Sequence, residues 1–311
     1  MKGYEVIDKI LNNINSVIAG KEDVVELAVI TLLSKGHILL EDVPGVGKTT
    51  LAKAMADTLG CKFKRIQFTP DTLPSDVTGV SVYNMSDGSF KYMEGSIMSN
   101  IVLADEINRT SPKTQSSLLE AMAEKQVTVD GITHKLKRPF MVIATQNPID
   151  YLGTYHLLEA QLDRFFMKVS IGYPDIEDEE KIINMYLKNE SFTDLEPVTN
   201  EEEIIMLQEE VSMVKVHKDI ITYILEIAKK TRRNDLIELG MSPRATMALI
   251  RGCQARAYIN KRDYVVPDDV LSLMEPIVYH RIILSDEAKL NKMTVNMVML
   301  KIKSLVKVPI L

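Results

Sequence analysis

One short segment contains the residues whose types and spacing most clearly predict chemistry. Residues 41–50 read EDVPGVGKTT, and they stand between an apolar run at 38–40 and a helical pattern at 51–60. A strand, a glycine-rich loop, a Lys-Thr pair and a helix in this order are typical of a phosphate-binding loop. Glycines let several backbone N–H groups converge on one oxyanion, and the N-terminus of the next helix adds a partial positive charge. We therefore predict that this segment binds nucleotide phosphates.

The side chains of this loop suggest separate roles. Lys48 would reach the β- and γ-phosphates, and the Thr49 hydroxyl would hold Mg²⁺. Asp42 departs from the pattern G-x-x-x-x-G-K-[ST], whose first glycine falls at that position. A carboxylate beside a polyphosphate is unfavourable unless it turns away or binds another group. The alternative interpretation is an ordinary strand-to-helix turn that happens to contain glycine. The predicted phosphate-binding residues are Pro44, Gly45, Val46, Gly47, Lys48, Thr49 and Thr50.

A second pair of candidate residues follows a later apolar run. Residues 101–104 read IVLA, and Asp105 and Glu106 come directly after them. A continuous apolar run suits a strand buried on both faces of a parallel sheet, and such sheets bind ligands at the carboxyl ends of their strands. Asp105 would hold Mg²⁺ directly or through water, and Glu106 would orient and polarise the attacking water. Two solvated acids at a strand end are the alternative, which the upstream phosphate loop disfavours.

Two further candidates lie near predicted strands. Asn147 ends the run 140–147, and its amide would lie beside Glu106 if the two strands are neighbours. A simple turn opened by Asn147 and the proline after it explains the same residues without any function. Val17 and Ile18 form a break before the first strand, where P-loop proteins often contact the base. Plain core packing is the alternative for this pair.

Two arginines occupy helix ends. Arg164 closes a helix just before a predicted strand at 166–171, and a cation at a helix C-terminus suits the helix dipole without any further role. Arg244 lies in the first turn of a helix that Ser242 caps. A cation there opposes the dipole at a cost of about 0.3–1 kcal/mol. A broken local rule often marks a functional position, and Arg244 would be well placed if an anion sat nearby.

The elements that must position these residues divide the chain in two. Strand and helix patterns alternate up to residue 174, and two segments with Asp-Gly turns, 80–92 and 127–134, predict β-hairpins. We therefore expect an α/β core over residues 1–174 and a helical domain over 175–311. The helices expected in the second domain span 177–189, 200–212, 217–230, 243–259, 267–281 and 286–306.

Composition and missing motifs exclude several classes of function. The 311 residues have 37 basic and 43 acidic side chains, and a net charge of −6 argues against broad nucleic-acid binding. No apolar run approaches the roughly 18 residues of a membrane span, and no signal-peptide pattern opens the chain, so we expect a cytoplasmic protein. The Asn-Lys-x-Asp motif of GTPases and the Gly-Ala-Phe-Thr-Gly-Ala loop of transcription activators are missing.

Taken together, the motifs resemble those of the AAA+ ATPases and, more narrowly, of the MoxR family. The resemblance is carried by residues 40–49, 104–109, 144–148 and 159–165, and more weakly by the Ser-Pro-Arg segment at 242–244. It implies a P-loop αβα sandwich with a five-stranded parallel sheet, followed by an all-α lid domain. It also implies subunits that form rings, usually hexamers. Members of the family tolerate an Asp at the first glycine position of the loop.

The resemblance also implies roles for residues that local patterns leave open. Asn147 corresponds to the first sensor, and Arg164 to the arginine finger that reaches the γ-phosphate of the neighbouring subunit. Arg244 corresponds to the second sensor, which contacts phosphate from the lid. The two hairpins would face the ring centre or a client protein.

On this basis we expect an enzyme that binds ATP with Mg²⁺ and hydrolyses the ATP. We expect this enzyme to use that hydrolysis as a chaperone-like remodeler or maturation factor that acts on partner proteins. Members of the family often work with partners that have a von Willebrand A domain. The alternatives are a magnesium-chelatase-type ATPase subunit and a nucleotide-gated scaffold with little hydrolysis.

Overall fold

The computed structural model describes residues 2–43, 45–86, 88–147, 154–187 and 195–309. Its centre is a five-stranded sheet in the order β2-β5-β8-β1-β9, and every pair of neighbouring strands is parallel. The predicted five-stranded parallel sheet is therefore confirmed. The strands are β1 (Ile38–Glu41), β2 (Phe63–Gln67), β5 (Ile101–Asp105), β8 (Met141–Gln146) and β9 (Met167–Val169).

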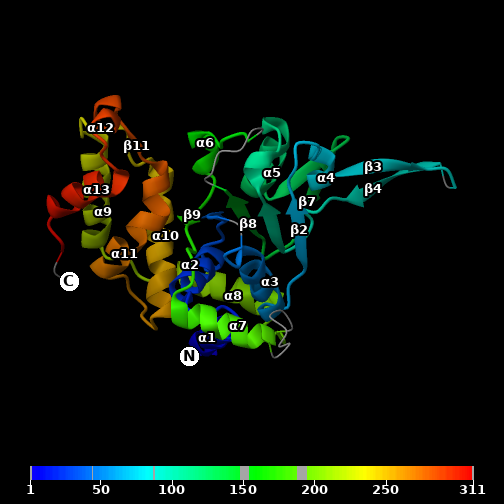
Figure 1. Cartoon of the computed structure of the whole chain (residues 1–311), viewed down its shortest axis with the longest axis horizontal. Coiled ribbons are helices and arrows are strands. Elements are labelled where there is room, and N and C mark those ends of the chain that lie inside the picture. The colour runs from blue at the N-terminus through cyan, green and yellow to red at the C-terminus, as the bar shows by residue number, and fades with distance from the viewer. Residues whose placement is uncertain (1, 44, 87, 148–153, 188–194, 310–311) are drawn as a thin grey trace.

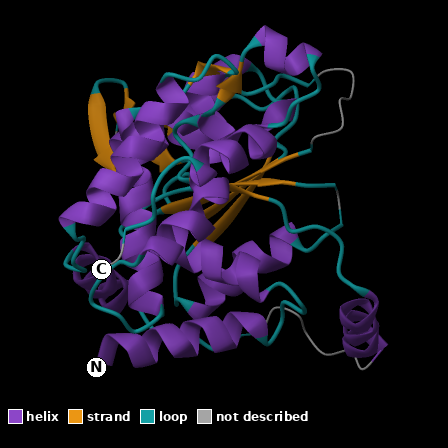
Figure 2. Ribbon diagram, turned by 90° about the vertical axis from the view of Figure 1, so that its left-hand side faces the viewer, coloured by secondary structure: helices purple, strands orange, loops and turns teal. Residues whose placement is uncertain are grey.

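Helices cover both faces of this sheet (Figure 2). Successive side chains of a strand point to opposite faces, so the apolar runs supply two separate cores. Ile38 and Leu40 belong to the larger cluster, whereas Leu39 between them belongs to the smaller one. The helices of the core are α1 (Lys2–Asn15), α2 (Glu22–Leu33), α3 (Lys48–Thr58), α4 (Pro74–Thr78), α5 (Pro112–Glu124) and α6 (Glu159–Leu162).

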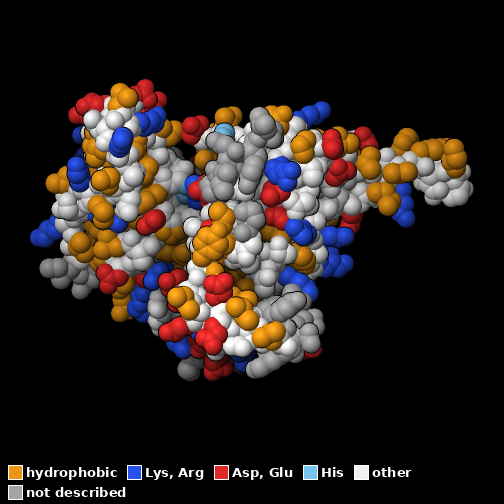
Figure 3. All heavy atoms as spheres, viewed as in Figure 1, with side chains coloured by type: hydrophobic (Ala, Val, Ile, Leu, Met, Phe, Trp, Pro, Cys, Tyr) orange, Lys and Arg blue, Asp and Glu red, His pale blue; other side chains and the backbone are white. Residues whose placement is uncertain are grey.

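Two β-hairpins interrupt the alternation, as predicted. The first consists of β3 (Gly79–Asn84) and β4 (Ser89–Glu94), and the second of β6 (Gln126–Val129) and β7 (Ile132–Lys135). The first hairpin projects from the body of the molecule (Figure 1) and exposes apolar side chains along its length (Figure 3). Tyr92 stacks on His134 with ring centroids 3.8 Å apart, so the two hairpins are in contact at their bases.

The C-terminal part is mainly helical, with two differences from the prediction. The helix expected over 286–306 is divided into α12 (Asp286–Leu290) and α13 (Val295–Ser304), because Lys292 adopts a φ of 54° and Thr294 caps the second helix. A short antiparallel pair, β10 (Ile237–Leu239) and β11 (Ile283–Leu284), was not predicted. The other lid helices are α9 (Lys218–Arg232), α10 (Pro243–Ile259) and α11 (Pro267–Val278).

Two helices lie between core and lid in the sequence: α7 (Ile176–Leu187) and α8 (Glu201–Ser212). Helix α8 packs against both α2 and α10, and the Gln208 side chain donates to the Leu32 carbonyl at 2.7 Å. The domain boundary between residues 174 and 175 stays a prediction. Within the described part of the chain, no helix combines the length and apolar character that a membrane crossing requires.

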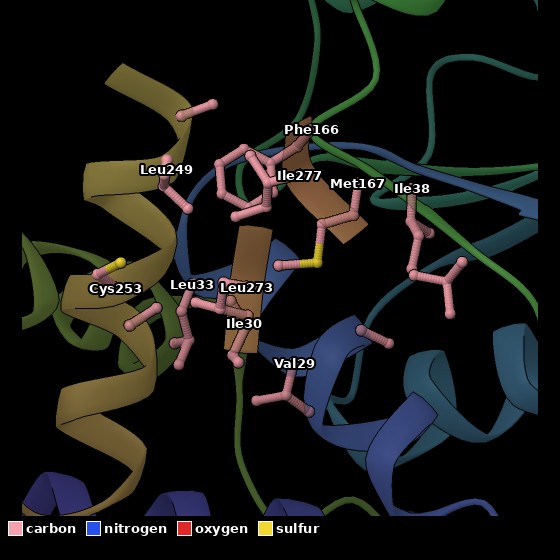
Figure 4. Packing of buried hydrophobic residues seen from close by; sticks show 14 of the residues in the cluster. Val29, Ile30, Leu33, Ile38, Phe166, Met167, Leu249, Cys253, Leu273 and Ile277 are labelled. Carbon is pink, nitrogen blue, oxygen red and sulfur yellow. The ribbon is translucent and has the colours of Figure 1, made fainter. Parts of the chain in front are cut away.

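The lid packs closely against the core beside β9 (Figure 4). Phe166 and Met167 lie against Leu249 of α10 and Ile277 of α11 in one buried cluster. Within the core, a Cβ atom at Gly36 would be 2.4 Å from Phe166 Cβ, so glycine allows the turn before β1 to approach Phe166 closely. The lid is therefore held by apolar packing around β9, which begins three residues after Arg164.

Candidate functional site

The predicted phosphate loop has the backbone geometry that anion binding requires. Gly45 and Gly47 have φ angles of 88° and 89°, which residues with a side chain rarely adopt. Gly47 is the N-cap of α3, and no side chain caps the N–H groups of that helix. These N–H groups are available to a phosphate together with the positive end of the helix dipole. Pro44, also predicted to bind phosphate, lies outside the described residues.

Lys48 lies in the first turn of α3, and its Nζ donates to the Asp42 carbonyl oxygen at 2.7 Å. Partial burial lowers the pKa of Lys48, while the nearby charges of Asp105, Asp42 and Glu106 act in the opposite direction. The ammonium group therefore lies at the end of β1 and is influenced by the charges of acids at the ends of β1 and β5. A polyphosphate would supply the stronger anionic partner here.

Asp42, the departure from the consensus loop, turns its carboxylate away from the loop. It accepts hydrogen bonds from the Ser170 hydroxyl at 3.1 Å and from the Gly172 N–H at 3.2 Å, and the Ile171 N–H donates to it as well. The side chain is buried and joins the end of β1 to the end of β9. A bound phosphate would therefore not face this charge.

A pocket of about 260 Å³ lies beside the phosphate loop. Val17 and Ile18 line it together with the loop, and Ile182 of α7 lines it as well. The mainly apolar lining suits a flat heterocyclic base, so the structure brings the predicted base and phosphate residues together. The candidate residues that line it are Val17, Ile18, Gly45, Val46, Gly47 and Thr50.

Asp105 ends β5 and is bound from both neighbouring strands. Arg65 of β2 lies 2.6 Å from its Oδ2, and the Thr145 hydroxyl of β8 donates to its Oδ1 at 2.6 Å. Hydroxyl and carboxylate oxygens are the ligands that Mg²⁺ prefers, so Thr49 and Asp105 fit this ion. The described residues include no group of three or more His, Cys, Asp or Glu side chains arranged to hold a metal. Mg²⁺ at this site would depend on phosphate and water oxygens for its remaining ligands.

Glu106 has an unusual backbone conformation. Its φ of 57° and ψ of 50° are left-handed, a state that costs a residue with a side chain roughly 1–3 kcal/mol and that clusters at functional sites. The backbone N–H donates to the Thr145 hydroxyl at 2.8 Å. Gln67 and Arg109 each donate to Glu106 Oε2 at 2.9 Å. The carboxylate is thus oriented by Gln67 at the end of β2 and by Arg109, three residues further along the chain.

Asn147 follows β8 directly, and β8 pairs with β5, which ends next to Glu106. The condition set by the sequence, that the two strands are neighbours, is therefore met. Asn147 is buried, and its carbonyl oxygen accepts from the Asn108 side chain at 3.3 Å.

The two candidate arginines lie together in a second pocket. This cationic pocket, of about 320 Å³, is lined by Arg164 after α6 and by Arg244 in the first turn of α10. Asp163 is the only acid among the described residues that line it. None of the described residues lines both this pocket and the nucleotide pocket, so Arg244 and the phosphate loop line separate pockets. The basic residues of the cationic pocket are Lys35, Lys125, Arg164, Arg244, Arg251 and Arg281.

His37 forms part of the wall of the cationic pocket. Its Nδ1 accepts from the Val142 N–H at 3.0 Å, and its Nε2 lies 3.2 Å from the Met122 carbonyl oxygen. Burial lowers the pKa of His37 to about 4. The neutral ring therefore joins β8 to the end of α5 without adding charge to the pocket.

Several residues of the site were not found from the sequence. Gln67, Thr145 and Arg109 bind the two acids, and Arg281 lies deep in the cationic pocket. Gln67 and Thr145 lie near the carboxyl ends of strands beside β5, so a predicted strand order was the signal that would have identified them. Nothing in the local sequence marks Arg281.

Comparisons with known proteins agree with this geometry. The profile of the ATPase family associated with various cellular activities (AAA) matches residues 37–167, and that of the AAA lid domain matches residues 229–299. The chain is 51% identical to the uncharacterized protein YeaC of Bacillus subtilis, over 99% of this chain and 96% of that protein. It is 36% identical to Chaperone MoxR1 of Mycobacterium tuberculosis, over 97% of this chain and 82% of that protein.

A solved structure shares the whole architecture. The crystal structure of a Cytophaga hutchinsonii protein with a provisional ATPase assignment superposes with a TM-score of 0.92 at 36% identity, covering 99% of this chain and 96% of that one. The similarity thus extends over the core, both hairpins and the lid. The chain is a nucleotide-binding ATPase, and it belongs to the MoxR family of AAA+ ATPases.

Proposed function

We propose that this ATPase works as a ring in which each active site is completed by the neighbouring subunit, and that it uses ATP to remodel partner proteins. The observation that carries the proposal is the separation of two pockets. Residues of the phosphate loop line the nucleotide pocket, whereas Arg164 and Arg244 line the cationic pocket. Because both arginines lie apart from their own loop, a second copy is the natural source of the triphosphate they would meet.

Within one subunit, the proposed roles belong to the loop and the strand ends. Lys48 and the N–H groups of α3 bind the β- and γ-phosphates. Thr49 and Asp105 hold Mg²⁺, which neutralises phosphate charge when it is bound. Glu106, oriented by Gln67 and Arg109, takes the proton of the attacking water, and Asn147 positions that water or the γ-phosphate.

Between subunits, Arg164 and Arg244 would stabilise charge on the γ-phosphate of the neighbour. Among NTPases, an arginine finger of this kind raises turnover by about 10³–10⁵. AAA+ ATPases are generally oligomeric, and a hexamer is the ring we propose by family resemblance.

The proposed client is a protein, for which a von Willebrand A domain partner is our first candidate. The first hairpin supports a protein-binding role, because it projects from the body and exposes Val82, Phe90 and Met93. The relative named Chaperone MoxR1 supports the same class of activity. We propose that the protein acts in the cytoplasm.

A magnesium-chelatase-type role is the second candidate. It is favoured by 25% identity to the magnesium-chelatase subunit ChlI homolog of Methanocaldococcus jannaschii over 86% of this chain. A metal-insertion assay with porphyrin and partner subunits would distinguish it from the remodeler.

Mixing two inactive variants tests the shared active site. Glu106→Gln removes the base of a subunit but keeps its arginines, whereas Arg164→Ala removes the finger but keeps the base. If sites are shared, ATP turnover reappears on mixing, because a Glu106 from one variant meets an Arg164 from the other. If each site is complete within one chain, the mixture stays as inactive as its components.

A further inference from the structure

The short loop that contains Arg164 is tied to the lid by a buried arginine. Residues 163–166 connect α6 to β9, and Phe165 is completely buried while Arg164 is exposed. Arg281 belongs to the lid, in the short helix η2 (Tyr279–Arg281) that follows α11. Its side chain is only 3% exposed, which is unusual for a guanidinium group.

The residues that Arg281 contacts lie on both sides of Arg164 in the sequence. One terminal nitrogen donates to the Phe165 carbonyl oxygen at 2.6 Å and to the Phe166 carbonyl oxygen at 3.3 Å. The other terminal nitrogen lies 3.2 Å from Asp163 Oδ1. One guanidinium therefore hydrogen-bonds the two residues after Arg164 and forms an ion pair with the residue before it. A lysine has no planar fork with which to make all three contacts.

The same carboxylate also reaches the second arginine. Asp163 Oδ2 lies 3.5 Å from the terminal nitrogen of Arg244 in α10. Asp163 thus stands between two lid arginines and is the residue next to Arg164. A connected set of polar contacts through Asp163 and Arg281 thus joins Arg244 of the lid to the loop that contains Arg164.

Arg281 keeps its charge in this buried position. Burial lowers the pKa of Arg281 to about 10, and Arg244 acts in the same direction while Asp163 opposes it. At neutral pH the group is therefore a cation whose desolvation is offset by Asp163 and two carbonyl oxygens. Polar contacts of this kind fix one arrangement, in contrast to the apolar packing of the adjacent lid–core interface (Figure 4).

We propose that Arg281 is a positioning residue that fixes the Arg164 loop to the lid, so that Arg164 and Arg244 move with the lid as one unit toward the nucleotide of the neighbouring subunit. The inference rests on the proposed sharing of sites between subunits. It goes further because it assigns a role to Arg281, which does not line the nucleotide pocket of its own chain. A lid movement in one subunit would then change hydrolysis in the next one.

The test uses Arg281→Lys in the full chain. The lysine keeps the charge but loses the fork, so we expect turnover to fall roughly 10- to 100-fold, as a small misplacement of a catalytic group does. Nucleotide binding to the variant itself should be unchanged. When the variant is mixed with Glu106→Gln, turnover should recover, because the Glu106→Gln subunits supply correctly placed Arg164 side chains to the intact sites of Arg281→Lys subunits.

Two variants keep this test decisive. Asp163→Asn weakens the same linkage from the core side and should show the same recovery on mixing. Arg262→Lys is the matched control, since Arg262 is another lid arginine with two close contacts to a buried carboxylate, at 2.7 and 2.9 Å from Asp269. It should leave turnover unchanged below its unfolding temperature.

The outcomes separate the two proposals. If Arg164→Ala recovers with Glu106→Gln but Arg281→Lys and Asp163→Asn do not, sites are shared and the positioning role of Arg281 is wrong. If none of the mixtures recovers, the sharing of sites fails, and the role of Arg281 fails with it.

Discussion

The nucleotide pocket and the cationic pocket are built in different ways. The first combines two short segments, residues 17–24 and residues 45–51 of the phosphate loop and α3, with Ile171, Pro174 and Ile182. The second collects its basic residues from segments far apart in the sequence, including the end of α5, the loop after α6, and α10. A local motif therefore reveals the phosphate-binding part of the first pocket, whereas only the folded chain reveals the second.

The two pockets also differ in charge and in completeness. The nucleotide pocket is mainly apolar and lies next to loop N–H groups, a lysine and two acids that suit one bound nucleotide with its metal ion. The described residues that line the cationic pocket carry an excess of positive charge, since Asp163 is the only acid among them. This difference supports the proposal that the cationic pocket acts on an anion that belongs to another molecule.

The largest effect is expected from the cationic pocket. Arg164→Ala should lower turnover by about 10³–10⁵, because the transition-state charge loses its finger. ATP hydrolysis at saturating ATP measures this change. Arg251→Ala removes the same charge from the same pocket, and as a steering charge it should cost less than roughly tenfold. Equal losses of turnover in the two variants would mean that Arg164 contributes only positive charge to the pocket and does not act as an arginine finger.

The next effect belongs to the nucleotide site. Glu106→Gln should lower turnover by about 10²–10⁴, because the amide cannot take the proton of the attacking water. Nucleotide binding, measured by titration calorimetry, should persist. Glu120→Gln, at an exposed acid of α5, serves as the control and should hydrolyse ATP normally. Normal turnover by Glu106→Gln would show that another group activates water.

The wall of the cationic pocket should respond to pH. The pKa of His37 is about 4 in the folded chain, below its ordinary value of 6.5. As the pH falls, His37 is therefore protonated in the unfolded chain before it is protonated in the folded chain. The free energy of unfolding falls between pH 6.5 and pH 4 as a result, by roughly 3 kcal/mol for this residue.

Urea unfolding of the wild type and of His37→Asn measures this contribution. The stability advantage of the wild type should be full above pH 6.5 and shrink as the pH falls to 4.5. A difference that stays constant over this range would mean that His37 is not a neutral, buried ring. His280, whose pKa burial lowers to about 3, contributes a slope in the same direction to both proteins.

Asp42 should affect stability more than nucleotide binding. Asp42→Gly, which restores the consensus glycine, leaves the N–H groups of Ile171 and Gly172 without their acceptor, so we expect a loss of about 1–3 kcal/mol. The control is Glu41→Gln, because the ion pair of Glu41 with Lys168 is partly exposed and should be worth roughly 0–1 kcal/mol. Tighter ATP binding by Asp42→Gly without loss of stability would contradict this role.

The smallest effect is expected from Ile182, the residue of α7 that lines the nucleotide pocket. Ile182→Ala should weaken ATP binding by about 1 kcal/mol, or roughly fivefold, since part of the apolar lining is removed. Its neighbour Ile183 is more exposed and does not line the pocket, so Ile183→Ala provides a matched comparison. Equal affinities of the two variants would show that α7 does not contact the base.

The sequence predicted the sheet, both hairpins and most helices because each has a strong local signal. Apolar runs mark the buried strands, Asp-Gly pairs mark the turns, and Ser242 with Pro243 marks the start of α10. The division between α12 and α13 was missed because the cap at Thr294 interrupts an otherwise continuous helical period. The pair β10–β11 was missed because its strands are only two and three residues long.

The site was predicted to the extent that it is local. Lys48, Asp105 and Glu106 follow from motifs that place them at a loop and at a strand end. The grouping of Arg164 with Arg244 and Arg281 depends on how the lid packs against β9, and no spacing along the chain encodes that packing. The partner of Asp42 was unpredictable for the same reason, since Ser170 and Gly172 lie far along the chain.

ATP turnover per subunit, measured against protein concentration, tests the shared active site most directly. If a neighbour completes each site, specific activity rises from near zero as subunits associate, and Arg164→Ala removes this rise. If specific activity stays constant down to dilutions where only monomers exist, each chain has a complete site. The cationic pocket would then have no part in hydrolysis, and the proposal that a neighbouring subunit completes each site would be wrong.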